Sequence, residues 1–243
     1  MHDQAQRYAR QMILPGFGDT AQARLRTAKV AVVGAGGLGS PVLYYLAAAG
    51  VGHITLIDGD RVALSNLHRQ ILFETADVTH FKAEAAQQSL NDLNPDCEVS
   101  SITQMLDDKN ATALLQGHDL VLDTSDRVAT RLAVNRACVT LSLPLVSAAV
   151  AGWHGQVYYF TGQPCYACLY PDIEPGTDDT ACSEAGILGS TAGIVGSWQA
   201  LWALQLLAQV GTVSPGNMLI LDANAAQMRH VKIERNPSCS VCS

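Results

Sequence analysis

The chain has 243 residues, of which 48% are hydrophobic, so it is long enough for one large α/β domain or two small ones. We expect a single domain over residues 1–243. Its 15 basic and 22 acidic residues give a formal net charge of -7, which argues against a general nucleic-acid-binding surface. The polar start MHDQAQRYARQ lacks the apolar segment of a secretory signal, so we expect a cytoplasmic protein with reduced cysteines.

Strand and helix patterns alternate through the first two thirds of the chain. A polar helical segment to about residue 28 is followed by strands expected at 29–33, 53–60, 97–104, 119–124 and 144–150. Between them lie helices expected at 38–50, 82–93, 110–117 and 127–141. This alternation predicts a doubly wound, mostly parallel, Rossmann-like α/β sheet.

The character of the chain changes in its last third. Strands expected at 156–160, 217–222 and 228–234 are separated by turns, so the sheet should finish with antiparallel strands. No charged residue lies between Glu184 and Asp222, a run long enough to cross a bilayer. Interrupting glycines, serines and glutamines, and the lack of a basic flank, favour instead a wholly buried helix, packed in the core or against a second copy.

A glycine turn follows the first strand. Gly34, Gly36 and Gly39 fit the G-x-G-x-x-G spacing that binds phosphate at a helix N-terminus, and Asp58 ends the next strand, where an acid binds a ribose hydroxyl. This spacing suits a nicotinamide dinucleotide as well as ATP. A triphosphate needs more cations, which Arg69 and Lys82 would supply with Asn66 as a neutral donor; the alternative is ordinary surface solvation.

Four of the seven cysteines form two C-x-x-C pairs. Together Cys165, Cys168, Cys239 and Cys242 could hold Zn²⁺ in a tetrahedral thiolate site, although redox pairs or plain thiols are also compatible with the spacing. Cys182 is unpaired and is either a nucleophile or a spare loop thiol. We expect Cys97 and Cys138 to be core residues.

Seven segments resemble, in order, the ThiF/MoeB/HesA adenylyltransferases, bacterial relatives of the ubiquitin-activating enzymes. They are RYARQ at 7–11, GAGGLGSP at 34–41, DGDRVALSNLHRQILF at 58–73, VLDTSD at 121–126, CYACLYPD at 165–172, ACSEAGILG at 181–189 and CSVC at 239–242. The resemblance implies an ATP- and Mg²⁺-dependent enzyme that adenylylates the C-terminal glycine carboxylate of a small ubiquitin-like sulfur-carrier protein ending in Gly-Gly. It implies a homodimer, a separate sulfur donor such as a cysteine desulfurase, and a thiamine carrier in preference to the molybdopterin-synthase small subunit.

The resemblance also assigns residues. The turn glycines Gly34, Gly36, Gly37 and Gly39 with Asn66, Arg69 and Lys82 would hold phosphates, Asp58 the ribose and Asp126 the Mg²⁺, leaving Asp123 as a structural acid. Arg10 would reach the γ-phosphate bound by the neighbouring subunit. The two cysteine pairs would bind a structural Zn²⁺, and Cys182 would attack the acyl adenylate or take part in sulfur transfer.

One departure from the family stands next to Asp126, where Arg127 replaces the common Asn. It puts the local hydrogen bonding in question. Two other kinds of function compete with adenylylation: a nicotinamide-dependent oxidoreductase, for which we find no proton donor, and a non-catalytic scaffold that binds carrier proteins.

Overall fold

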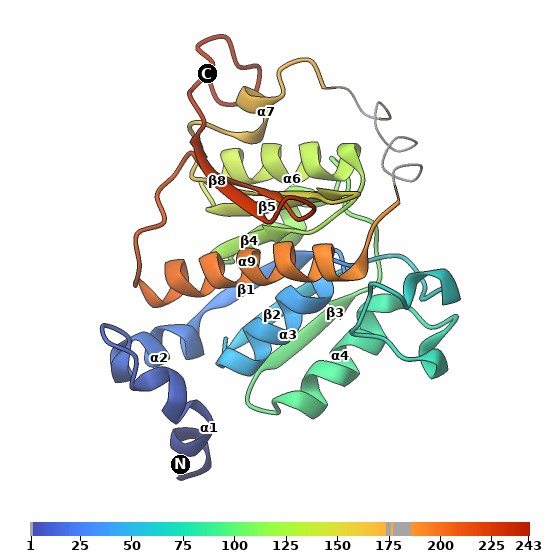
Figure 1. Ribbon diagram of the computed structural model, residues 1–243, viewed down its shortest axis with the longest axis vertical. Helices are drawn as coiled ribbons and strands as arrows, with labels where there is room; N and C mark the ends of the chain where they lie inside the picture. The colour runs from blue at the N-terminus through green and yellow to red at the C-terminus, as the bar shows by residue number, and fades with distance from the viewer. Residues whose placement is uncertain (1, 174–175, 177–185) are drawn as a thin grey trace.

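A single eight-stranded sheet runs through the computed structural model, which describes residues 2–173, 176 and 186–243 (Figure 1). The strands are β1 (Lys29–Val33), β2 (His53–Ile57), β3 (Glu98–Ile102), β4 (Leu120–Asp123), β5 (Leu145–Ala151), β6 (His154–Phe160), β7 (Asn217–Asp222) and β8 (Gln227–Lys232). Their order is β3-β2-β1-β4-β5-β6-β7-β8. The pairs from β3 to β5 are parallel and those from β5 to β8 are antiparallel, which confirms the predicted fold class.

Helices cover both faces of this sheet (Figure 1). On one face lie α1 (His2–Met12), α2 (Gly18–Thr27), α3 (Gly39–Ala49), α4 (Lys82–Leu93) and α9 (Gly189–Ala208). On the other lie α5 (Ala111–Leu115), α6 (Val128–Leu141) and α7 (Tyr166–Leu169). Each face has its own hydrophobic core, and β1 and β4 contribute to both because they are buried apolar runs in the middle of the sheet.

The connections reverse direction at β1. The chain passes from β1 to β2 and β3 on one side, then crosses to β4 on the other side of β1. At such a reversal the loops that follow neighbouring strands separate and leave a crevice at the carboxyl ends. The loops after β1, β2 and β4 therefore border one space.

The glycine turn after β1 is built on very close packing. Gly34 has φ +99°, a left-handed conformation that glycine adopts without strain. A Cβ on Gly39 would lie 2.3 Å from the carbonyl oxygen of Gly34. The same carbonyl accepts a hydrogen bond from Thr124 Oγ1 at 2.7 Å, which ties the turn to the end of β4.

The apolar helix α9 packs on α3, β5 and β6. Within one chain this helix is only partly buried, since Ile194 and Leu201 are 45% and 42% exposed, and its burial against a second copy stays a prediction. None of the described helices is both long and apolar enough to cross a membrane. The exposed side of α9 carries a groove of about 430 Å³, which we call the α9 groove. It is lined by Ser190, Gly193, Ile194, Ser197, Trp198 and Leu201.

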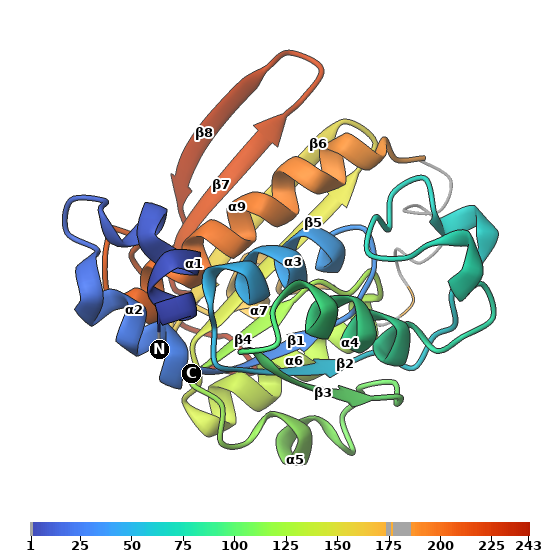
Figure 2. The ribbon, with the colours of Figure 1, turned by 90° about the horizontal axis from the view of Figure 1, so that it is seen from below.

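The edge strand β8 differs from the rest of the sheet. It pairs only with β7 within the described chain, and all six of its residues are exposed. Figure 2 shows β7 and β8 as a hairpin that extends past the helices.

The close approach of Gly39 to Gly34 generates a stability prediction. Gly39→Ala should lower the free energy of unfolding by about 1–3 kcal/mol, because the new methyl group must displace backbone. Gly36→Ala is the matched control in the same turn, since its Cβ would meet only Gln70 Nε2 at 3.7 Å. Urea unfolding of both variants measures the difference, and equal midpoints would contradict the packing described here.

Candidate active site

A cavity of about 560 Å³ lies at the carboxyl ends of the central strands. Its walls come from the segments after β1, β2, β3 and β4 and from β5, and its lining cations are Arg69, Lys82, Arg127 and Arg131. This volume is in the range of sites that enclose a small ligand.

Three of the four turn glycines reach this cavity. Gly34, Gly36 and Gly37 are among its lining residues, whereas Gly39 begins α3 and packs against Gly34 behind them. The first turn of α3 therefore starts beside the cavity, with the partial positive charge of a helix N-terminus; the amide of Ser40 is bonded to the carbonyl of Gly36, and Pro41 has no amide hydrogen.

Asp58 lies in the cavity wall just after β2 and is only 8% exposed. Its carboxylate accepts hydrogen bonds from the amides of Ala35 at 2.7 Å and Asp60 at 2.8 Å. Burial raises the pKa of Asp58, while the charge of Lys82 and these two amides act in the opposite direction. The carboxylate is thus fixed between the glycine turn and the β2 loop.

The cations Lys82 and Arg69 both line the cavity. Lys82, 6% exposed, donates from Nζ to Asp60 Oδ2 at 3.2 Å. Arg69 donates from Nη1 to the carbonyl of Ser65 at 3.1 Å, and His68 Nε2 lies 2.8 Å from the same nitrogen.

Two predicted phosphate contacts lie elsewhere. Asn66 ends the short 3-10 helix η1 (Leu64–Asn66), and its Oδ1 accepts the amide of Ala63 at 3.2 Å instead of lining the cavity. Arg10 is exposed on α1, where the neighbouring Tyr8 packs against Gly50 at the far end of α3. Figure 2 shows α1 at the amino ends of the strands, so one chain does not bring Arg10 to its own cavity.

Two acids follow β4 and take different positions. Asp126 lines the cavity. Asp123 is fully buried and accepts hydrogen bonds from Ser125 N at 3.0 Å, Ser125 Oγ at 2.6 Å and Ser147 Oγ at 2.8 Å. Asp123 thus holds the β4 loop against β5, whereas Asp126 faces the cavity.

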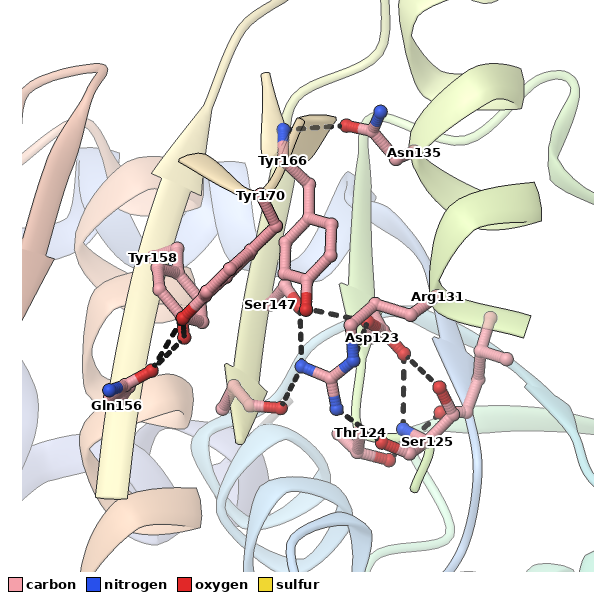
Figure 3. Close-up of polar contacts among 12 residues, drawn as sticks. Asp123, Thr124, Ser125, Arg131, Asn135, Ser147, Gln156, Tyr158, Tyr166 and Tyr170 are labelled. Atoms are coloured by element: carbon pink, nitrogen blue, oxygen red, sulfur yellow. Dashed lines mark hydrogen bonds and ion pairs between the residues drawn. The ribbon is translucent and has the colours of Figure 1, made fainter. Parts of the chain in front are cut away.

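A buried arginine that the sequence did not single out forms part of the cavity floor (Figure 3). Arg131 Nε lies 3.8 Å from Asp123 Oδ2, and its Nη2 and Nη1 donate to the carbonyls of Ser125 at 2.6 Å and Ala148 at 2.9 Å. Its guanidinium also stands 5.6 Å from the ring centre of Tyr166. The signal for this role in the sequence is weak: Arg131 is a charged residue among the mostly apolar residues of the helix expected at 127–141.

Figure 3 also shows a second, smaller cluster of polar side chains, formed by Gln156, Tyr158 and Tyr170. The hydroxyls of Tyr158 and Tyr170 lie 3.0 Å apart, and Tyr170 donates to Gln156 Oε1 at 3.0 Å. Burial raises the pKa of Tyr158, so it stays a neutral phenol.

The structure brings the two cysteine pairs together at the end of α7. The Sγ atoms of Cys165, Cys168, Cys239 and Cys242 all lie within 4.8 Å of one another. Cys165 and Cys239 are 3.7 Å apart, and Cys168 and Cys242 are 3.4 Å apart. A tetrahedral Zn²⁺ site has sulfur atoms about 3.8 Å apart, so these four residues could hold a metal ion.

The other cysteines divide into two groups. Cys97 and Cys138 are buried in the cores, and burial raises the pKa of Cys97 to about 12. This confirms that both are core residues. Cys182 lies outside the described residues.

Comparison with known proteins places this site in context. Residues 8–241 match the model of the ThiF family. The chain is 45% identical over 247 residues to the sulfur carrier protein adenylyltransferase of Thermus thermophilus, covering 99% of this chain and 91% of that protein. It is 44% identical over 245 residues to the adenylyltransferase and sulfurtransferase MOCS3 of Drosophila ananassae, covering 100% of this chain and 54% of that protein. The chain thus spans about half the length of the MOCS3 relatives that it matches.

Solved structures share the fold. The structure of E. coli MccB with ATP superimposes with a TM-score of 0.84 at 23% identity, over 97% of this chain and 74% of that one. PaaA superimposes with a TM-score of 0.82 at 20% identity, over 97% of this chain and 75% of that one. Family model, relatives and fold agree, and this chain belongs to the ThiF family.

Proposed function

We propose that this protein uses ATP and Mg²⁺ to adenylylate the C-terminal glycine carboxylate of a small ubiquitin-like sulfur-carrier protein ending in Gly-Gly, with release of pyrophosphate. The observation that carries this proposal is the cavity, in which Asp58, Arg69, Lys82 and Asp126 come from separate segments to surround one glycine turn. The relatives named as adenylyltransferases support the same reaction.

The chemistry suits a site made of positioned charges. A carboxylate is ionised at neutral pH and can attack the α-phosphorus of ATP without a general base. Catalysis then requires alignment of the carboxylate, the α-phosphorus and the leaving pyrophosphate, and neutralisation of phosphate charge. Arg69 and Lys82 supply fixed positive charge, and the N-terminus of α3 adds the positive end of its helix dipole beside the glycine turn.

The ribose and the metal ion of the nucleotide also have candidate contacts. Asp58 is held by two amides at a depth suited to a ribose hydroxyl. Asp126 presents a carboxylate in the cavity wall, and carboxylate oxygens are preferred Mg²⁺ ligands. Bound Mg²⁺ would lower the repulsion between the phosphates and the incoming carboxylate. A nicotinamide enzyme would leave these cations and Asp126 without a role.

Loss of either cation tests the assignment. Arg69→Ala and Lys82→Met should each reduce carrier-dependent ATP–pyrophosphate exchange by about 100-fold or more, because fixed charge at the phosphates is removed. Methionine at position 82 keeps the buried stem of the side chain. Lys109→Gln, an exposed cation outside the cavity, is the matched control and should keep full exchange. Full exchange in Arg69→Ala would refute its role.

The same exchange assay identifies the carrier. We propose a thiamine-pathway carrier as the substrate, with the molybdopterin-synthase small subunit as the alternative and a cysteine desulfurase as the sulfur donor. Exchange with one purified carrier and not the other assigns the pathway. Binding of ATP with no exchange for any carrier would instead support a scaffold that binds carriers without activating them.

We also propose Zn²⁺ at the four-cysteine cluster. A closed shell of four thiolates leaves no open position for chemistry, so the metal would join the C-terminal tail to α7. Purified protein should contain about one Zn²⁺ per chain by elemental analysis, and Cys239→Ser should lose the metal and melt several degrees lower. Cys97→Ala is the control that should retain the metal, and a metal-free wild-type protein with unchanged melting temperature would refute the site.

A homodimer would explain Arg10 and the α9 groove. The exposed apolar side chains of the groove suit burial against a second copy, and an Arg10 from that copy would supply the cation that one chain cannot.

Complementation tests this arrangement. Arg10→Ala and Lys82→Met homodimers should both be inactive, whereas a heterodimer purified with two different tags should recover about half of wild-type activity, since one of its two sites is intact. An inactive heterodimer would show that Arg10 does not act across the interface.

A further inference from the structure

Arg127 stands immediately before α6, where its local environment does not favour an arginine. The residue is the N-cap of α6, with φ -99° and ψ 126°, and its side chain makes no capping hydrogen bond. A guanidinium carries only donors, so it cannot accept from the free amides of the first helical turn. Its charge also opposes the positive end of the helix dipole. Local helix stability therefore gives no reason for an arginine here.

The position of Arg127 in the cavity supplies a reason. Arg127 Nη2 lies 3.7 Å from Asp60 Oδ1. Asp60 follows β2 and Arg127 follows β4, and these two strands flank β1 on opposite sides. The ion pair therefore reaches across the end of β1, and both residues line the cavity beside the glycine turn.

The ion pair between Arg127 and Asp60 is weak enough for Arg127 to leave it for another acceptor. The side chains of Arg127 and Asp60 are 51% and 43% exposed, and ion pairs at such exposure contribute little free energy. Asp60 also accepts Lys82 Nζ at 3.2 Å, so it keeps a cationic neighbour if Arg127 leaves. A phosphate group that approaches the glycine turn offers Arg127 two acceptor oxygens, and such a bidentate contact is stronger than the exposed ion pair with Asp60.

The charge of the cavity depends on Arg127. Its lining acids are Asp58, Asp60 and Asp126, and its lining cations are Arg69, Lys82, Arg127 and Arg131. Arg131 is already matched by the buried Asp123. The other three cations balance the three acids. Without Arg127 the lining would carry a net negative charge. It would then repel magnesium-bound ATP, because that complex is itself an anion.

We propose that Arg127 is a phosphate-binding residue of this protein, which leaves Asp60 when magnesium-bound ATP enters and donates hydrogen bonds to the β- or γ-phosphate oxygens. The inference rests on the proposed function, because it requires ATP as the ligand. It assigns a role to the position at which the family resemblance leads us to expect Asn.

Calorimetric titration of the whole protein with ATP and with AMP, both in Mg²⁺, tests this role without a carrier protein. Arg127→Asn should raise the Kd for ATP about tenfold or more, because a charge-assisted contact is lost. The Kd for AMP, which lacks the β- and γ-phosphates, should change less than about twofold. Arg127→Lys keeps the charge but loses the bidentate geometry, so its Kd for ATP should lie between those of wild type and Arg127→Asn.

A melting measurement separates this role from a structural one. Asparagine is a good N-cap, so Arg127→Asn should melt at the same temperature as wild type or about 2–4 °C higher while binding ATP more weakly. Arg136→Gln is the matched control: Arg136 lies on the same helix, pairs with Asp108 at 2.6 Å and is outside the cavity. It should leave the Kd for ATP unchanged.

The outcomes are distinct. Equal Kd values for ATP in wild type and Arg127→Asn, or equal weakening for ATP and AMP, would overturn the role of Arg127 and leave the proposed function intact. Failure of the wild-type protein itself to bind ATP would overturn both.

Discussion

The buried ion pair between Asp123 and Arg131 is the interaction on which the rest of the site depends. A charge inside a protein is tolerated only when it is paired and its remaining hydrogen-bonding capacity is used. Asp123 ends β4, and Arg131 lies one turn into α6. Between them they bind the hydroxyls or carbonyls of Ser125, Ser147 and Ala148, which belong to the β4 loop and to β5. This network fixes the backbone that leads into Asp126.

The fold was predictable because its signals are local. Runs of β-branched residues that end in glycine or acids gave strands such as β1 and β2 close to their observed bounds, and Gly50 ends α3 in a left-handed conformation as a helix-ending glycine should. The antiparallel pairs β5–β6 and β7–β8 also followed from their short connections, because an antiparallel pair needs only a short turn. The expectation that turns alone separate the last strands is wrong for β6 and β7, which pair antiparallel although α7 and α9 lie between them in the chain.

Side-chain partners were harder to predict, because they depend on tertiary contacts. Asn66 and Arg69 are neighbours in the sequence, yet the turn of η1 uses the Asn66 side chain for its own backbone. Arg131 and Arg136 lie on one helix, and only the direction in which each faces decides that one is buried beside Asp123 and the other exposed beside Asp108. Asp60 gave no separate signal, although it holds two cations in the cavity.

The exposed edge of the sheet has a consequence for assembly. An unpaired edge strand presents free backbone donors and acceptors that can template pairing with another molecule. On β8 a symmetric antiparallel pair centred between His230 and Val231 would place Arg229 opposite Lys232. Two like charges directly opposed across a strand pair repel, so pairing of two copies of β8 in this register is disfavoured. Charge alone provides this protection, because Met228 and Val231 on the same strand are exposed and apolar.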